Sequence, residues 1–269
     1  MGILSSKEAL VGSRAIFEQL YDDYNRRVYV SPDPLQFLYD YDDPGDREVT
    51  ALIASSLAYG KVAQILKSVS IVLDALGPAP AVFLKNTDKK ELQAKLGGFV
   101  HRFTDEAAIV SFLLCIGGIL KRNGSLEDLF LSHYHGDTWD AAERFVCELM
   151  ACESKTEMFL LPRPSKGSAC KRLALFLRWV VRCDEVDPGG WRKITPDALF
   201  IPLDTHMFQI CSNLGLCTRK SADGKAAIEI TENFRLVRPD ERVRYDFSMR
   251  RFGIRSEMSH EELFAKWRQ

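Results

Sequence analysis

The spacing of apolar residues predicts helices along most of the chain. Residues 47–76 form a nearly continuous apolar stretch with helical spacing, interrupted only at Tyr59-Gly60-Lys61. Alternating β-branched patterns are scarce and short, so no extended strand is expected. The pattern therefore predicts an all-α protein. Outside 47–76 and the unit described next, helices are expected at 7–29, 81–84, 89–96, 105–122, 126–132 and 139–150.

Residues 161–216 combine a proline-rich turn, two helices and an intervening loop. The turn is Leu161-Pro162-Arg163-Pro164-Ser165-Lys166-Gly167-Ser168, a density of Pro and Gly that ends one helix and begins another. An apolar helical run follows, and after a loop at 187–190 the segment Ile201-Pro202-Leu203-Asp204-Thr205-His206 leads into a second helix. A lysine-rich turn and an aspartate at a helix start thus belong to one unit.

This unit resembles the helix-hairpin-helix DNA glycosylase superfamily, which includes endonuclease III and the adenine and 8-oxoguanine glycosylases. In those proteins a Leu-Pro hairpin leads to a helix with a lysine, and a segment like Val-Asp-Thr-His carries the catalytic aspartate. Residues 201–206 match that segment, with Asp204 in the aspartate position. The hairpin departs from the family pattern, because Pro164-Ser165-Lys166-Gly167 replaces the usual Gly-apolar-Gly turn. The long lysine-to-aspartate spacing is more similar to the archaeal 8-oxoguanine glycosylase branch, and the whole chain looks like a bacterial family related to the superfamily.

The resemblance implies a two-lobed helical fold with a central cleft. Residues 46–182 would form the middle lobe, ending in the hairpin and the lysine helix, and residues 1–45 with 183–269 would form the terminal lobe. The lysine would then lie on one wall of the cleft and Asp204 on the other. The implied activity is base-excision repair: a DNA glycosylase, with or without AP-lyase activity, that removes an oxidised purine such as 8-oxoguanine from double-stranded DNA.

The chemistry of this reaction restricts the catalytic candidates. A carboxylate can stabilise the cationic sugar, and a lysine can attack the sugar carbon only as the neutral amine. Lys171 is the first choice because it lies in the first turn of its helix, and Lys166, in the turn itself, is the second. Either lysine could instead be an ordinary solvated side chain, and Asp204 could be a plain helix N-cap.

The same unit suggests a contact with the DNA backbone. The stretch from Arg163 to Arg182 contains six cationic residues and no acidic one, and small residues in the turn would let a phosphate approach the backbone. Before it, Tyr59 falls near the place where relatives insert a side chain into DNA, although a packed tyrosine at a helix kink explains it equally well. The residues expected to bind DNA are Arg163, Ser165, Lys166, Gly167, Ser168, Arg172, Tyr59 and Lys61.

Composition adds limits on cofactors, partners and location. A net charge of −1 over 269 residues counts mildly against a nucleic-acid role, so the local cluster of cations matters more. Seven cysteines lack the spacing of an iron–sulfur loop, and none follows Cys217, so no cluster, metal or other cofactor is expected. No signal peptide or membrane span is evident. We expect a cytoplasmic, nucleoid-associated monomer.

Two other functions are compatible with the same residues. The altered hairpin could belong to a non-catalytic DNA-binding protein on the same fold. An all-α protein-interaction scaffold would need neither DNA nor catalysis. Salt-dependent binding to duplex DNA would separate the scaffold from the other two, because only phosphate contacts release counterions.

Overall fold

The computed structural model describes residues 2–4, 6–151, 160–254 and 258–268. It is predominantly helical, which confirms the expected all-α class. The helices are α1 (Lys7–Gly12), α2 (Arg14–Tyr24), α3 (Pro44–Ser56), α4 (Val62–Leu76), α5 (Pro80–Asn86), α6 (Lys89–Leu96), α7 (Glu106–Asn123), α8 (Leu126–His133), α9 (Thr138–Ala151), α10 (Lys171–Val181), α11 (Thr205–Leu214), α12 (Gly224–Val237), α13 (Asp246–Ile254) and α14 (His260–Ala265). The 3-10 turns are η1 (Arg27–Tyr29), η2 (Pro34–Asp40), η3 (Pro164–Lys166) and η4 (Pro196–Ala198).

Two expectations about the elements were wrong. The helix expected at 7–29 breaks at Ser13, whose backbone N–H already closes α1. The chain also forms a short antiparallel hairpin, β1 (Val100–His101) with β2 (Thr104–Asp105), where no strand was expected. Two residues per strand are too few to produce an alternating pattern that a sequence could reveal.

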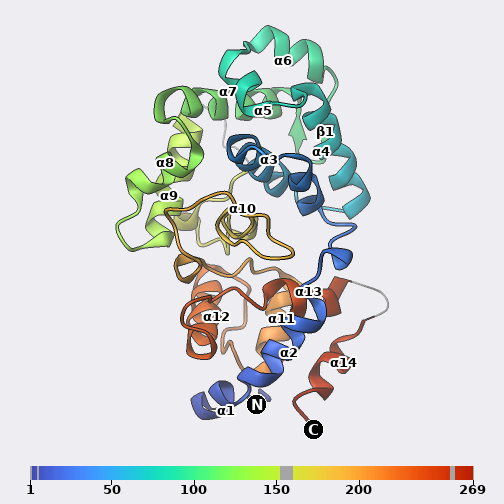
Figure 1. Cartoon of the computed structure of the whole chain (residues 1–269), viewed down its shortest axis with the longest axis vertical. Helices are drawn as coiled ribbons and strands as arrows, with labels where there is room; N and C mark the ends of the chain where they lie inside the picture. The colour runs from blue at the N-terminus through green and yellow to red at the C-terminus, as the bar shows by residue number, and fades with distance from the viewer. Residues whose placement is uncertain (1, 5, 152–159, 255–257, 269) are drawn as a thin grey trace.

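Helices distant in sequence pack side by side. In Figure 1, α3 to α9 lie in the upper half, α1, α2 and α11 to α14 lie in the lower half, and α10 lies between them. Helix α10 packs against α3, and α13 packs against both α11 and α2. The lower half is therefore built from both ends of the chain, and α10 can present residues to both halves. One continuous hydrophobic core runs through the molecule.

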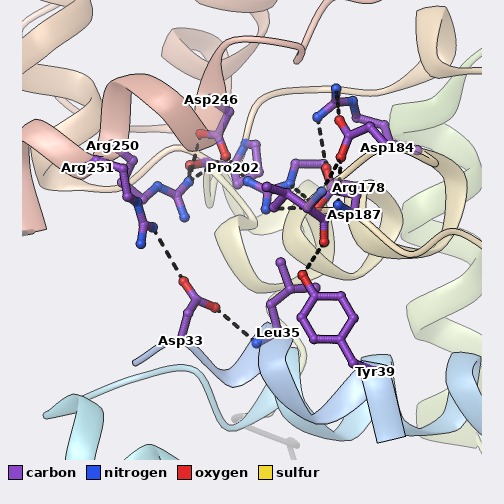
Figure 2. A network of polar contacts seen from close by, with 12 residues as sticks. Asp33, Leu35, Tyr39, Arg178, Asp184, Asp187, Pro202, Asp246, Arg250 and Arg251 are labelled. Atoms are coloured by element: carbon purple, nitrogen blue, oxygen red, sulfur yellow. Dashed lines mark hydrogen bonds and ion pairs between the residues drawn. The ribbon is translucent and has the colours of Figure 1, made fainter. Parts of the chain in front are cut away.

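A buried ionic network surrounds the C-terminal half of α10 (Figure 2). Arg178 pairs with Asp187 at 3.1 Å and with Asp246 of α13. Arg182 pairs with Asp187 and Glu241, both at 2.8 Å. Both arginines belong to the expected basic strip, yet both are buried and neutralised, so they present no charge to DNA. These ion pairs could not be predicted from the sequence, because none of the acidic partners lies between Arg163 and Arg182.

Glu48 of α3 is a buried carboxylate that holds three segments together. It accepts hydrogen bonds from the backbone N–H groups of Leu126 and Glu127, which begin α8, and from Trp191 Nε1 at 2.8 Å. Burial disfavours the ionised form and outweighs these donors, raising the pKa of Glu48 to about 7. Its protonation therefore changes within the ordinary range of pH.

Within the described residues, no single helix is long and apolar enough to cross a bilayer. Two pairs of consecutive helices, α4 with α5 and α7 with α8, reach that length and composition only when both members are counted, and each pair is sharply bent.

Candidate functional site

Lys171 and Asp204 form an ion pair, with 2.9 Å between Nζ and Oδ2. Lys171 is the first residue of α10, and Asp204 is the N-cap of α11, where its Oδ1 accepts the backbone N–H of Met207 at 2.9 Å. The side chains are 33% and 16% exposed, so the pair is accessible from solvent. The expected proximity of these residues is confirmed, and Asp204 acts as a helix cap at the same time.

The surroundings of Asp204 keep it ionised. Burial alone would disfavour the carboxylate, but the nearby charges of Arg250 and Lys171 and the Met207 N–H more than compensate, so the pKa of Asp204 lies well below its usual range. Arg250 is itself buried and donates to the Pro202 carbonyl at 2.8 Å and to Asp246 at 2.8 Å, as Figure 2 shows. The site thus contains a fixed negative charge held by two cations.

A cavity of about 400 Å³ opens beside Lys171. Its wall comes from both halves of the molecule: the segment that leads into η2, the loop between α3 and α4, the start of α4, the turn before α10, α10 itself, and α13. The lining residues are Pro32, Asp33, Pro34, Ala58, Tyr59, Gly60, Val62, Ile65, Pro162, Ser168, Lys171, Arg172, Leu175 and Arg250. This volume lies within the range of about 300–1,000 Å³ that is usual for ligand pockets, and the mixture of apolar walls with a few charged groups is also usual.

The turn before α10 is held from inside the protein. Glu143 of α9 accepts the backbone N–H and the hydroxyl of Ser165, both at 2.9 Å, and pairs with Arg163. Burial opposes ionisation of Glu143, but these donors lower its pKa to about 2, so it is an anion. A carboxylate from α9 therefore bonds both Arg163 and Ser165, and their expected contact with a DNA phosphate stays a prediction.

Other parts of the turn remain compatible with an anion. Gly167 adopts a left-handed conformation at φ 77°, and a Cβ there would meet no atom within 4 Å, so a ligand can approach its backbone. Ser168 lines the cavity and its hydroxyl accepts the Cys170 N–H at 3.1 Å. No described side chain caps the start of α10, and its first two residues, Lys171 and Arg172, line the cavity.

Lys166 and Lys171 have different places in the structure. Lys166 is exposed on η3 and does not line the cavity, whereas Lys171 does. Of the two candidate lysines, Lys171 therefore lies in the cavity wall and Lys166 is a surface cation. Lys61 is exposed at the N-cap of α4, next to Gly60 in the cavity wall.

Tyr59 is part of the cavity wall and does not project from the surface. Its ring lies 4.5 Å from the His101 ring and 5.0 Å from the Arg172 guanidinium, and its hydroxyl donates to the His101 carbonyl at 2.8 Å. Of the two interpretations of Tyr59, the packed tyrosine beside a break at Gly60 is correct, and insertion into DNA is not supported. Arg172 is fixed by Tyr59 and by the Ser56 carbonyl, and burial lowers its pKa to about 10, so it stays cationic.

Arg250 and Asp33 were not identified from the sequence. Arg250 lies far along the chain in a segment crowded with other arginines, and Asp33 is surrounded by prolines, so neither stood out. Asp33 caps η2 through Leu35 N at 3.0 Å and lies 3.5 Å from Arg251. Within the ranges that the structure describes, no three His, Cys, Asp or Glu side chains gather as a metal ion would require.

Comparison with known protein families places the chain in one of them. It belongs to the family described as "Protein of unknown function (DUF2400)", which matches residues 33–255 and so includes Lys171, Asp204 and every lining residue of the cavity except Pro32. Comparisons with curated proteins and with solved structures found no match.

Proposed function

We propose that this protein is a DNA glycosylase of base-excision repair, acting on a damaged purine in duplex DNA. The observation that carries the proposal is the Lys171–Asp204 pair, 2.9 Å apart at the edge of a cavity. Two residues far apart in sequence meet where the resemblance to the helix-hairpin-helix glycosylases requires them. The division into lobes 46–182 and 1–45 with 183–269 is part of the same proposal.

The site is suited to a nucleotide that has left the base stack. Extruding a nucleotide from a duplex costs a few kcal/mol, and the enzyme must offset this with contacts to the extruded base and its phosphates. The apolar walls and the Tyr59 ring offer a surface for a base. The uncapped start of α10, with Lys171 and Arg172, offers cationic and N–H groups for a phosphate.

Asp204 supplies a negative charge to the sugar. As the bond from C1′ to the base nitrogen breaks, its electron pair leaves with the base and positive charge develops on the sugar ring. The ionised Asp204 stabilises that charge, and it is a poor general base because its pKa is low. A water molecule can then attack C1′ and lose a proton to the departing base, which gives a hydrolytic glycosylase.

Lys171 permits a second course of the reaction. Its Nζ can attack C1′ as the base leaves with the electron pair of its bond to C1′. The proton that Nζ loses passes to the departing base, and opening of the sugar ring then gives an iminium ion between Nζ and C1′. Lys171 is the only one of the two lysine candidates in the cavity wall. An enzyme that follows this course is a bifunctional glycosylase and lyase.

The test is a screen of the purified full-length protein against duplexes that each contain one damaged purine, beginning with 8-oxoguanine. We expect free damaged base, measured by mass spectrometry, from at least one duplex and none from the undamaged control. Binding that weakens with salt but never releases a base would identify the chain as a non-catalytic DNA-binding protein. Absence of salt-dependent binding would exclude both DNA roles.

A further inference from the structure

A second cavity, of about 560 Å³, lies between the loop before α9, the start of α9, η4 and α12. It shares no lining residue with the cavity beside Lys171. In Figure 1 its main elements, α9 and α12, both lie on the left. Its volume is within the range of about 300–1,000 Å³ that is usual for ligand pockets. The cavity is therefore large enough for a ligand of its own.

The walls of this second cavity are largely aromatic. Tyr134, Trp139 and Phe200 line it, and the Trp139 and Phe200 rings meet edge to face with their centroids 4.7 Å apart. Phe200 is buried, whereas Tyr134 and Trp139 are partly exposed and keep surface that a ligand can cover. Ile228 of α12 lines the same cavity and is 43% exposed. An occupant with an apolar or flat surface is therefore favoured.

The charged lining residues of the cavity are mainly acidic. Asp137 before α9, Asp197 of η4 and Glu232 of α12 line it, and Arg242 is the one cation among its described lining residues. Glu232 pairs with Arg242 at 3.2 Å, so these two charges offset each other. Asp137 accepts two backbone N–H groups at the start of α9, and neither Asp137 nor Asp197 forms an ion pair with another described residue. Two carboxylates are thus left for a ligand.

This charge selects the kind of ligand. Carboxylates without a cationic partner attract a cation and repel the phosphates of a nucleic acid. A guanidinium group suits the aromatic walls as well, because it stacks flat on a ring and donates two parallel hydrogen bonds to a carboxylate. The ammonium group of lysine has no flat surface and is more strongly hydrated, so apolar walls disfavour it. An arginine side chain therefore matches the cavity better than a lysine side chain.

We propose that the second cavity binds an arginine side chain of another protein, with the guanidinium group on the Trp139 ring and in contact with Asp137 and Asp197. Tyr134 and Ile228 offer the aliphatic part of that side chain an apolar surface. The acidic lining would repel the carboxylate of free arginine, which favours an arginine within a polypeptide. This arginine site is separate from the cavity of the proposed glycosylase reaction.

The experiment follows the indole N–H signals of the four tryptophans by NMR in the full-length protein, with Trp139→Phe used to assign one of them. The probe is N-acetyl-L-arginine amide, whose ends carry no charge. We expect it to shift the Trp139 signal saturably and to leave the signals of the buried Trp179 and Trp191 in place. The citrulline analogue is flat but neutral and the lysine analogue is charged but not flat, so each should bind at least about tenfold more weakly.

Asp137→Asn and Asp197→Asn test the carboxylates. Asn caps a helix as well as Asp does, so α9 should keep its start, and the Asp197 side chain has no described partner to lose. Each variant should bind the arginine probe about tenfold more weakly, the effect of losing one charge-assisted hydrogen bond. Asp88→Asn is the matched control, because it changes the net charge equally at the far upper end of the molecule in Figure 1. It should bind the probe as the wild type does.

Four results would overturn the arginine site. They are the absence of a saturable shift with the arginine probe, equal affinity for the citrulline or lysine analogue, wild-type affinity in both Asp variants, and a shift that Asp88→Asn weakens as much as they do. Tighter binding of free L-arginine than of the blocked probe would assign the cavity to a small molecule and reject the protein partner. None of these measurements involves DNA, so their outcome is independent of the test of base release.

Discussion

Replacing Asp204 by Asn removes one charge and little else. An amide oxygen can still accept the Met207 N–H, and Asn is as good an N-cap as Asp, so α11 should keep its start. Lys171 and the buried Arg250 lose their common anion. Loss of such charge-assisted contacts costs about 1–3 kcal/mol, which should lower the free energy of unfolding by that amount and leave the protein folded.

The effect on catalysis should be larger than the effect on stability. Removing one group that stabilises transition-state charge typically slows a reaction about 100- to 1,000-fold. The assay is single-turnover release of the damaged base, with binding to the same duplex measured separately. We expect Asp204→Asn to bind with an affinity close to that of the wild type and to release base at least about a hundredfold more slowly.

Asp88→Asn provides the control for capping alone. Asp88 caps α6 through the Glu91 N–H at 2.9 Å, it is exposed, and α6 lies at the far upper end of the molecule in Figure 1. Its substitution should leave base release unchanged. If Asp204→Asn releases base at the wild-type rate, or if both variants lose activity in proportion to their stability, the electrostatic role of Asp204 is refuted.

Three further results are expected. If the reaction uses a lysine, borohydride reduction on a damaged duplex should join the protein covalently to the DNA. Lys171→Gln should abolish this covalent complex and Lys166→Gln should not. The reverse result would identify Lys166 as the nucleophile. Lys166→Ala should weaken binding to all duplexes alike and reduce the salt slope by about one unit, and an unchanged slope would mean that η3 does not contact phosphate. The pKa of Glu48 in the folded protein is about 7, above the ordinary value of 4.5, so the folded state binds this proton more tightly than the unfolded state does. The free energy of unfolding should therefore fall by about 3 kcal/mol as the pH rises from about 4.5 to 7. Glu48→Gln should remove this part of the pH dependence in denaturant titrations, and identical curves for both proteins would show that folding does not shift the pKa of Glu48.

The sequence predicted those features that depend on local periodicity. Residues 47–76, with their break at Tyr59-Gly60-Lys61, became α3 and α4, and 89–96 became α6, because apolar spacing and turn residues act within one element. The proximity of Lys171 and Asp204 came from a resemblance and not from periodicity. It could be anticipated because both residues stand at helix starts within one recognisable unit.

Long-range pairing could not be predicted in the same way. The cations of the 163–182 stretch looked unopposed, yet Glu143, Asp187, Glu241 and Asp246 reach them from other segments. The sequence could not place Arg250 near Asp204 either, because the two residues come together only when α13 packs on α11. Charge counted along a sequence therefore overestimated the basic surface of this protein.

The central claim is that Lys171 and Asp204 act as one unit on one sugar. A kinetic double-mutant cycle tests it most directly, with base release from the preferred damaged duplex measured for Lys171→Gln, Asp204→Asn and the double variant. Residues that act as a unit give non-additive effects, so the double variant should be about as slow as the slower single variant. Effects that multiply in the double variant, or base release that neither substitution slows, would contradict the claim.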